Sequence, residues 1–222
     1  MLAELQQHLA DLYRVDMAHD VRDFLITDPT LARVLSQDAM ATNTQETLLV
    51  SEDDMGLSMS LFLDGDMLER LEAGAPLDSL DPGQLDDFWQ VLEGISHFNC
   101  MAWKASRDRS VSLLELELQA EIDKYLTTMT LALEQANSEL RERVHHTLFE
   151  ATRFREELDD DERDRYRAAN DYAARFCYRV GQRLERRGRL PLRELRHFYR
   201  LQLNDKISHI HTQAWAPASA PA

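Results

Sequence analysis

Apolar residues recur every three to four positions from about residue 84 to about residue 210, and this periodicity constrains the fold more than any other feature. The chain has only 7 glycines and 6 prolines in 222 residues, so it lacks the frequent turns that a many-stranded sandwich or barrel requires. Amphipathic helices with short connections are typical of an antiparallel bundle. We therefore expect a mainly α protein with a bundle of about five antiparallel helices over residues 84–213.

The periodic stripes place the five helices at about residues 84–105, 112–135, 137–154, 161–187 and 191–210. In the fourth of them, Gly188 directly follows the last periodic residue, as expected at a helix C-terminus. The fifth aligns its apolar residues from Leu192 to Ile210, so it is predicted to be one continuous helix.

Residues 1–83 have a different pattern and are predicted to form an N-terminal α/β segment. Residues 2–13 have helical spacing, and Asp28 before Pro29 is typical of a helix start. Alternating apolar residues at 57–63, preceded by residues 46–50, predict a β-hairpin near 46–64. The sequence DMLE, which begins at Asp66, resembles a capping box. At the other end of the chain, residues 214–222 are rich in Ala and Pro, so we expect a disordered tail.

Composition predicts a cytoplasmic protein without a membrane span. No apolar run approaches 18 residues, and the first residues lack the basic-then-apolar order of a signal peptide. Cys100 and Cys177 stand alone, which favours two buried thiols over a disulfide or a metal site. No phosphate-binding loop, dinucleotide fingerprint or nucleophile elbow is present, and no cofactor is predicted.

Charge is distributed unevenly along the chain. Residues 1–162 hold 12 Lys and Arg against 35 Asp and Glu, a net charge of −23, while residues 163–222 hold 13 against 5, a net charge of +8, which together give −15. Nine arginines and no lysine lie between Arg175 and Arg200. This pattern favours contacts with carboxylates or phosphates, either in the chain's own acidic part or in a partner. The residues predicted to bind a partner are Arg175, Arg179, Arg183, Arg186, Arg193 and Arg196.

The stretch VSLLELELQAEIDKY, residues 111–125, places four carboxylates among leucines. Ser112 and Glu115 have the spacing of a capping box, in which the Glu115 side chain would bond to the Ser112 amide. Glu117 and Lys124 fall on one strip of the helix and are expected to form part of its polar surface. We interpret these carboxylates as structural, on a central helix that is contacted on two sides.

A carboxylate–histidine metal protein is one alternative. Glu-x-x-His spacings occur at Glu142–His145 and Glu194–His197, but helical projection points both pairs away from the core. Glu93 and His97 are four residues apart and could share a proton or a divalent ion. They are also expected on a polar strip of their helix, and a solvated ion-pairing strip is the favoured explanation of this pair.

A helical ribonuclease is the second alternative. Arg141 and His146 in RERVHH have the R-x4-H spacing, and the motif resembles that of the HEPN ribonucleases. The resemblance implies that the arginine holds a phosphate and the histidine moves a proton. It covers six residues, and Glu142 follows the arginine where those enzymes commonly carry Asn, His or Asp.

The favoured interpretation is a non-catalytic interaction or regulatory protein that docks a macromolecular partner through its arginine-rich helical face. An acidic protein surface fits this face better than nucleic acid does, because the total charge of −15 opposes non-specific binding to a polyanion. The oligomeric state is left open.

Overall fold

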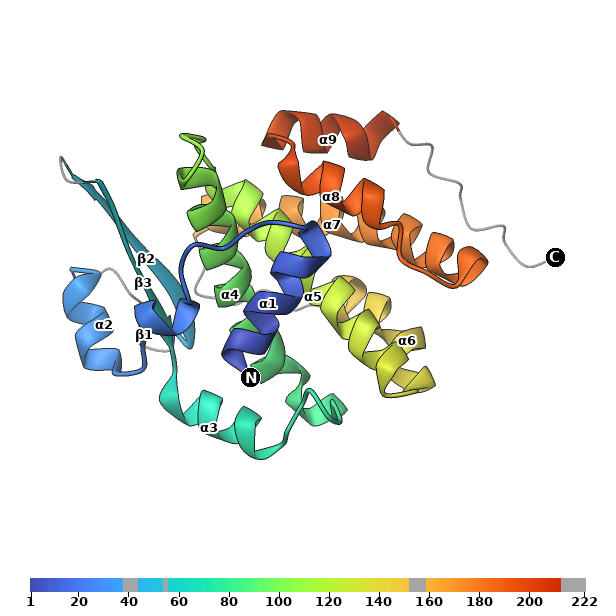
Figure 1. The fold of residues 1–222 in the computed structure, drawn as a ribbon, viewed down its shortest axis with the longest axis horizontal. Helices are drawn as coiled ribbons and strands as arrows, with labels where there is room; N and C mark the ends of the chain where they lie inside the picture. Colours follow the sequence, from blue (N-terminus) through green and yellow to red (C-terminus); the bar gives the residue numbers. More distant parts are fainter. Residues whose placement is uncertain (38–43, 54–55, 152–158, 213–222) are drawn as a thin grey trace.

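The computed structural model describes residues 1–37, 44–53, 56–151 and 159–212, which form a mostly helical protein with a small three-stranded sheet (Figure 1). The expected mainly α class is confirmed. The helices are α1 (Leu2–Tyr13), α2 (Pro29–Leu35), α3 (Gly65–Ala73), α4 (Leu85–Ala105), α5 (Leu113–Glu134), α6 (Ser138–His145), α7 (Asp160–Arg187), α8 (Leu192–Arg200) and α9 (Leu203–Thr212). The strands are β1 (Leu25–Ile26), β2 (Glu46–Asp53) and β3 (Gly56–Leu63). The predicted tail, 214–222, lies outside the described residues.

Helix α5 is the centre of the structure. It packs against α4, α6 and α7, which agrees with the prediction of a central helix. Its buried apolar residues lie on opposite sides and include Leu116, Leu118, Ala120, Ile122, Met129 and Leu131. A helix enclosed on several sides also carries its polar residues into the interior, and this decides where the carboxylates of residues 111–125 lie.

The sheet has the strand order β1–β3–β2. Strand β2 pairs antiparallel with β3, with Glu46 opposite Leu63, and β1 pairs parallel with β3. The end of β3 from Leu61 to Leu63 is fully buried, and β2 and β3 both pack against α4. Strand β1 was not expected, because two residues are too few to show an alternating pattern.

The sheet approaches α4 most closely at Gly94. A Cβ atom at this position would lie 2.8 Å from Cδ1 of Leu61 and 3.0 Å from Cγ of Glu46. Glycine therefore leaves the room that both side chains occupy. Because β2 begins at Glu46, this contact places an acidic side chain directly against α4.

Several helix ends follow the sequence signals. Asp28 caps α2 as predicted, and Gly188 ends α7 in the left-handed conformation with φ of 65°. Helix α3 begins earlier than predicted, because Asp64 rather than Asp66 is its N-cap and accepts the hydrogen bond of the Met67 amide. The DMLE stretch therefore lies inside the helix.

The predicted last helix is wrong in one respect: it is broken into α8 and α9. Leu201 between them has extended backbone angles, φ of −71° and ψ of 156°. The break directs Lys206 of α9 into the core, where its side chain is fully buried.

The third predicted helix also ends early, since α6 stops at His145 and a π-helical turn covers His146–Glu150. Residues 152–158 lie outside the described part.

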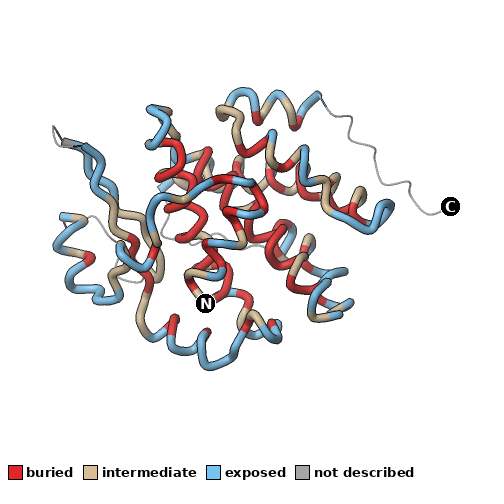
Figure 2. Tube along the Cα trace, in the orientation of Figure 1, coloured by how far each residue is buried: buried red, intermediate tan, exposed pale blue. Residues whose placement is uncertain are grey.

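One hydrophobic core joins the two ends of the chain. Helix α1 packs against α4 and α8, and buried residues from Leu2 to Ile210 belong to a single cluster (Figure 2). Within the described ranges, no helix is both long and apolar enough to span a membrane. The domain boundary at residues 83–84 stays a prediction.

Candidate functional site

Two groups of buried polar side chains lie along α5. Glu115, Glu117 and Asp123 are all buried, with exposed fractions between 1% and 8%. The predicted polar-surface position of Glu117 and Lys124 is therefore wrong. Ser112 does accept the Glu115 amide hydrogen bond as a helix cap, but the Glu115 side chain pairs with lysines instead of closing a capping box.

The first group, which we call the neutral network, consists of Tyr13, Ser96, Lys104, Glu115, Gln119, Asp123 and Lys206. Ser96 donates a 2.6 Å hydrogen bond to Oδ2 of Asp123, and both Tyr13 and Gln119 donate to Oδ1. Lys206 donates to Oε1 of Gln119 at 2.9 Å. These bonds connect α1, α4, α5 and α9.

Two lysines complete the neutral network. Lys104 and Lys206 both contact Oε1 of Glu115, and Lys206 does so at 3.3 Å. Lys104 also donates to the Leu201 carbonyl at 3.4 Å, an oxygen that the break between α8 and α9 leaves outside a helix. Two lysines thus face two carboxylates, and among the described residues each buried polar atom of this network has a partner. A balanced and satisfied network has a structural role.

The second group is different and is the candidate site. We call it the carboxylate–histidine cluster: Glu46, Glu93, His97, Glu117, Glu121 and Lys124. Nδ1 of His97 lies 3.5 Å from Oε1 of Glu46, and Nε2 lies 3.7 Å from Oε2 of Glu117. Lys124 lies 2.6 Å from Glu93 and 2.8 Å from Glu121.

Two atoms of this cluster are buried without a hydrogen-bond partner among the described residues: Oε1 of Glu46 and Nε2 of His97. Their side chains are only 8% and 9% exposed. A buried polar atom without a partner is costly, so each one calls for a physical explanation. The prediction that Glu93 and His97 lie close together is confirmed, but their expected place on a solvated strip is wrong, because β2 covers that side of α4.

The electrostatics of the cluster reflect its excess of carboxylates. Burial raises the pKa of Glu117 to about 7 and also raises the pKa values of Glu46 and Glu121. Burial alone would lower the pKa of His97, but the neighbouring carboxylates of Glu46 and Glu117 outweigh it and raise this pKa to about 9. Four carboxylates thus face one lysine and one imidazolium, so the ionised cluster has a formal charge of −2.

A cavity of about 500 Å³ adjoins the cluster. Its walls include Glu93, Glu121 and Lys124 together with Trp89 and Thr147. Glu93 is 17% exposed and Glu121 is 19% exposed, in contrast to the more deeply buried His97. The cavity therefore gives a small solute access to the Glu93 side of the cluster.

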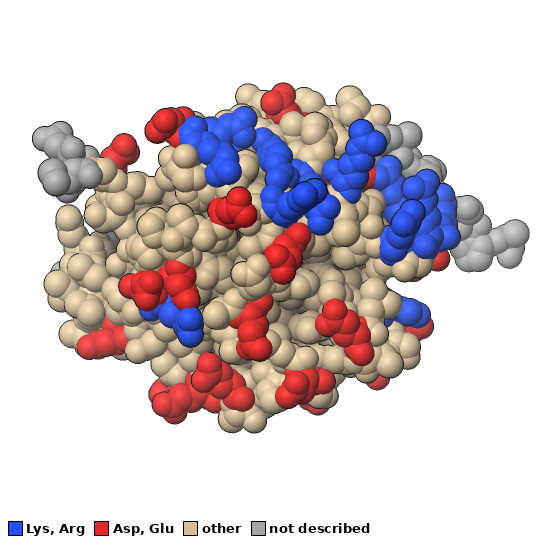
Figure 3. Space-filling view, in the orientation of Figure 1, with Lys and Arg blue, Asp and Glu red and all other residues tan. Residues whose placement is uncertain are grey.

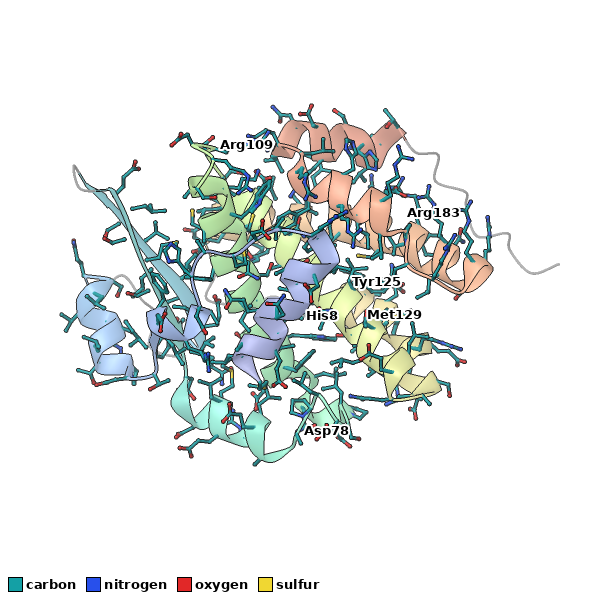
Figure 4. The ribbon with its side chains drawn as sticks, in the orientation of Figure 1. His8, Asp78, Arg109, Tyr125, Met129 and Arg183 are labelled. Carbon is teal, nitrogen blue, oxygen red and sulfur yellow. The ribbon has the colours of Figure 1, made fainter. Side chains whose placement is uncertain are left out.

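A larger cavity of about 910 Å³ lies at the junction of α7 and α8. We call it the arginine groove; it is lined by Arg183, Arg187, Arg189, Leu190, Pro191, Leu192, Arg193, Glu194 and His197. Figure 3 shows lysine and arginine side chains gathered over this end of the visible face, and Figure 4 labels Arg183 on α7 near the junction. Arg183 and His209 both contact Glu194, the only acidic residue in the lining.

The predicted partner-binding arginines are divided among four settings. Arg183 and Arg193 line the arginine groove. Arg196 instead donates to the Leu12 carbonyl at 3.2 Å, at the C-terminal end of α1. Arg175 and Arg186 are exposed outside the groove, and Arg179 packs over the Phe176 ring at 5.6 Å. The lining adds Arg187 and Arg189, which the arginine-rich pattern contained but did not single out.

The predicted ribonuclease pair lies on α6 and the turn after it. Arg141 is exposed, and His146 is 67% exposed with Nδ1 3.0 Å from Glu150. The structure therefore leaves this function as a prediction. Of the Glu-x-x-His pairs, Glu142 and His197 are exposed as expected.

The other member of each pair, His145 and Glu194, was also predicted to point to solvent, but neither does. His145 faces α7, with Nε2 3.1 Å from the Ala174 carbonyl. Glu194 is only 15% exposed and turns toward Arg183 and His209.

Comparisons with known proteins give no assignment: no family model, curated protein or solved structure matches the chain. The function therefore has to be argued from the site itself. Sequence reasoning missed Glu46 and Glu117 as neighbours of His97. Glu46 lies 51 positions before His97 in the sequence, and only Gly94, a glycine in the middle of a helix, marked the close approach.

Proposed function

We propose that this chain is a non-catalytic interaction protein that docks an acidic segment of a protein partner in the arginine groove. The observation that carries the proposal is the lining itself: four arginines and one glutamate around a cavity of about 910 Å³. Arg187, Arg189 and Arg193 are exposed and have no hydrogen bond or ion pair with any residue that the structure describes. Their guanidinium groups are therefore available for carboxylates, which they bind in a bidentate fashion.

An acidic protein segment fits this groove better than a nucleic acid does. Leu190, Pro191 and Leu192 form an apolar part of the lining, and Leu192 is 38% exposed. A peptide that combines carboxylates with apolar side chains would cover this part as well as the guanidinium groups. The whole chain is strongly acidic, with a net charge of −15, and would repel a long polyanion.

The test uses a fluorescent peptide of alternating Glu and Leu residues, with binding followed by anisotropy at two salt concentrations. The triple variant Arg187→Glu, Arg189→Glu, Arg193→Glu is expected to weaken binding at least about 100-fold, because three attractive contacts become repulsive. A control peptide with Gln in place of every Glu is expected to bind weakly to the unchanged chain.

The matched control is Arg141→Glu, Arg143→Glu, Arg167→Glu, which changes the charge equally at exposed positions outside the groove. It is expected to retain at least half of the peptide affinity. If both triple variants lost peptide affinity equally, the loss would come from the change in net charge alone, and the proposal would be overturned. Preferential binding of single-stranded RNA, with cleavage lost in His146→Ala, would support the ribonuclease instead.

A further inference from the structure

We infer that the carboxylate–histidine cluster is a binding site for one divalent transition-metal ion, held by Glu46, Glu93 and His97, with Glu117 positioning the imidazole. Among the described residues, these three side chains form a group whose ligand atoms all lie within 4.8 Å of one another. An ion with bonds of about 2.1 Å holds its ligand atoms about 3–4 Å apart. Small side-chain rotations therefore bring the three atoms to bonding distance.

The two ring nitrogens of His97 have different surroundings. Nδ1 lies 3.5 Å from Oε1 of Glu46, which is too long for a hydrogen bond but suits two ligands of one ion. Nε2 lies on the other side, 3.7 Å from Oε2 of Glu117. A metal-bound histidine commonly donates its second N–H to a carboxylate, which fixes the tautomer and the ring orientation. Glu117 lies on the Nε2 side of His97 at 3.7 Å, so a small shift of either side chain would bring the two atoms within hydrogen-bond distance.

Unpartnered buried atoms point to a ligand at this place. Oε1 of Glu46 and Nε2 of His97 have no hydrogen-bond partner in the described part of the chain, and both side chains are more than nine-tenths buried. An ion between Glu46 and His97 would occupy the unpartnered oxygen directly. It would also leave Nε2 as the protonated nitrogen, which faces Glu117 at 3.7 Å.

The charge of the cluster leads to the same conclusion. Glu46, Glu93, Glu117 and Glu121 contribute four negative charges, and Lys124 contributes one positive charge. Protonated His97 adds a second positive charge, which gives −2, and a divalent ion that displaces this proton changes the sum to −1. The neutral network on the same helix has no such excess, since Lys104 and Lys206 balance Glu115 and Asp123. One helix thus carries a self-sufficient polar network beside an incomplete one.

Ligand chemistry restricts the ion to a small class. Two carboxylates and one imidazole suit Mn²⁺, Fe²⁺ or Zn²⁺, whereas Ca²⁺ and Mg²⁺ prefer oxygen ligands alone. The cavity of about 500 Å³ beside Glu93 provides an entry path and room for water molecules in the remaining coordination positions. This inference is independent of the arginine groove.

The test is a titration of the chelator-treated full chain with Mn²⁺ and, separately, with Zn²⁺ by isothermal titration calorimetry. We expect one equivalent to bind, and the Mn²⁺ complex to show ¹⁴N coupling from one imidazole in pulsed electron paramagnetic resonance. Glu46→Gln, Glu93→Gln and His97→Gln are each expected to lower the affinity more than about 100-fold, and Glu117→Gln about 10–100-fold. His97→Gln should also remove the ¹⁴N coupling.

The control is Glu134→Gln, at an exposed position of α5, which should leave affinity and stoichiometry unchanged. The three glutamine variants at glutamate positions reduce the excess negative charge, so they are expected to fold, which circular dichroism checks. If a variant does not fold, the stoichiometry and the ¹⁴N coupling of the unchanged chain decide the question. Absence of saturable binding of either ion, or binding without ¹⁴N coupling, would overturn the inference.

Discussion

Asp123 shows how a single buried carboxylate couples the neutral network to pH. It accepts hydrogen bonds from Tyr13, Ser96 and Gln119. Burial nevertheless raises its pKa from 3.8 to about 6, because the lost solvation outweighs these bonds. The charged form is therefore less favourable in the folded chain than in the unfolded chain, and the difference corresponds to about 3 kcal/mol.

This difference predicts a specific pH dependence. Well below pH 3.8, Asp123 is protonated in both states, whereas well above pH 6 it is charged in both, so its contribution to the free energy of unfolding falls as the pH rises between these values. Asp123→Asn removes the charge and keeps the shape. We expect the free energy of unfolding of the variant, relative to that of the unchanged chain, to increase by about 2 kcal/mol from pH 4 to pH 7.

Urea unfolding at pH 4, 5, 6 and 7 measures this difference. Asp86→Asn, at an exposed position of α4, is the control and is expected to give a nearly constant difference from the unchanged chain. Parallel stability profiles for Asp123→Asn and the unchanged chain would contradict the account of Asp123.

Among the elements, the sheet and α4 are in close contact at Gly94. Gly94 lets β2 and β3 lie against the helix, with Leu61 and Glu46 in the space that a Cβ atom would take. Helix propensity by itself favours alanine over glycine by about 1 kcal/mol. The packing of the sheet opposes this preference, because Leu61 is fully buried and cannot move into solvent.

Gly94→Ala is therefore expected to destabilise the fold by about 1–2 kcal/mol, because overpacking outweighs the gain in helix propensity. The control is Gly65→Ala in the first turn of α3, where a Cβ atom would meet Thr27 at an ordinary 3.7 Å. That variant should change stability by less than about 0.5 kcal/mol. Thermal and urea unfolding measure both, and a more stable Gly94→Ala variant would refute the steric account.

At the scale of the whole molecule, α8 connects the C-terminal part of the chain to α1 through hydrogen bonds. Arg200 donates to the carbonyls of Tyr13 at 3.0 Å and Arg14 at 2.8 Å, and Arg196 donates to that of Leu12. These carbonyls lie at the C-terminal end of α1, where backbone acceptors lack helical partners and where a positive charge is favourable. Two arginines of the basic segment thus serve the fold rather than a partner.

Arg200→Ala is expected to lower the free energy of unfolding by about 1–3 kcal/mol, since it removes the charged hydrogen bonds between α8 and the C-terminal end of α1. Arg200→Lys should recover only part of this loss, because an ammonium group cannot reproduce the fork of a guanidinium group. Arg193→Ala is the matched control on the same helix and should have little effect on stability, since Arg193 is exposed. Equal stability of the Arg200→Ala and Arg193→Ala variants would disprove this role.

The sequence by itself determined the helical class, the positions of α1, α4, α5 and α7, the cap at Asp28 and the stop at Gly188, because these features depend on local periodicity and backbone preference. It also placed Glu93 beside His97, since both lie on one helix. Only the tertiary structure decided which face of α4 the sheet covers, and hence that His97 meets Glu46 and Glu117 in the interior. It also decided that α9 turns back so that Lys206 reaches Glu115. The physical reason is the same in both cases: helical projection gives the direction of a side chain, but whether that direction leads to water or to another element depends on packing between segments distant in sequence.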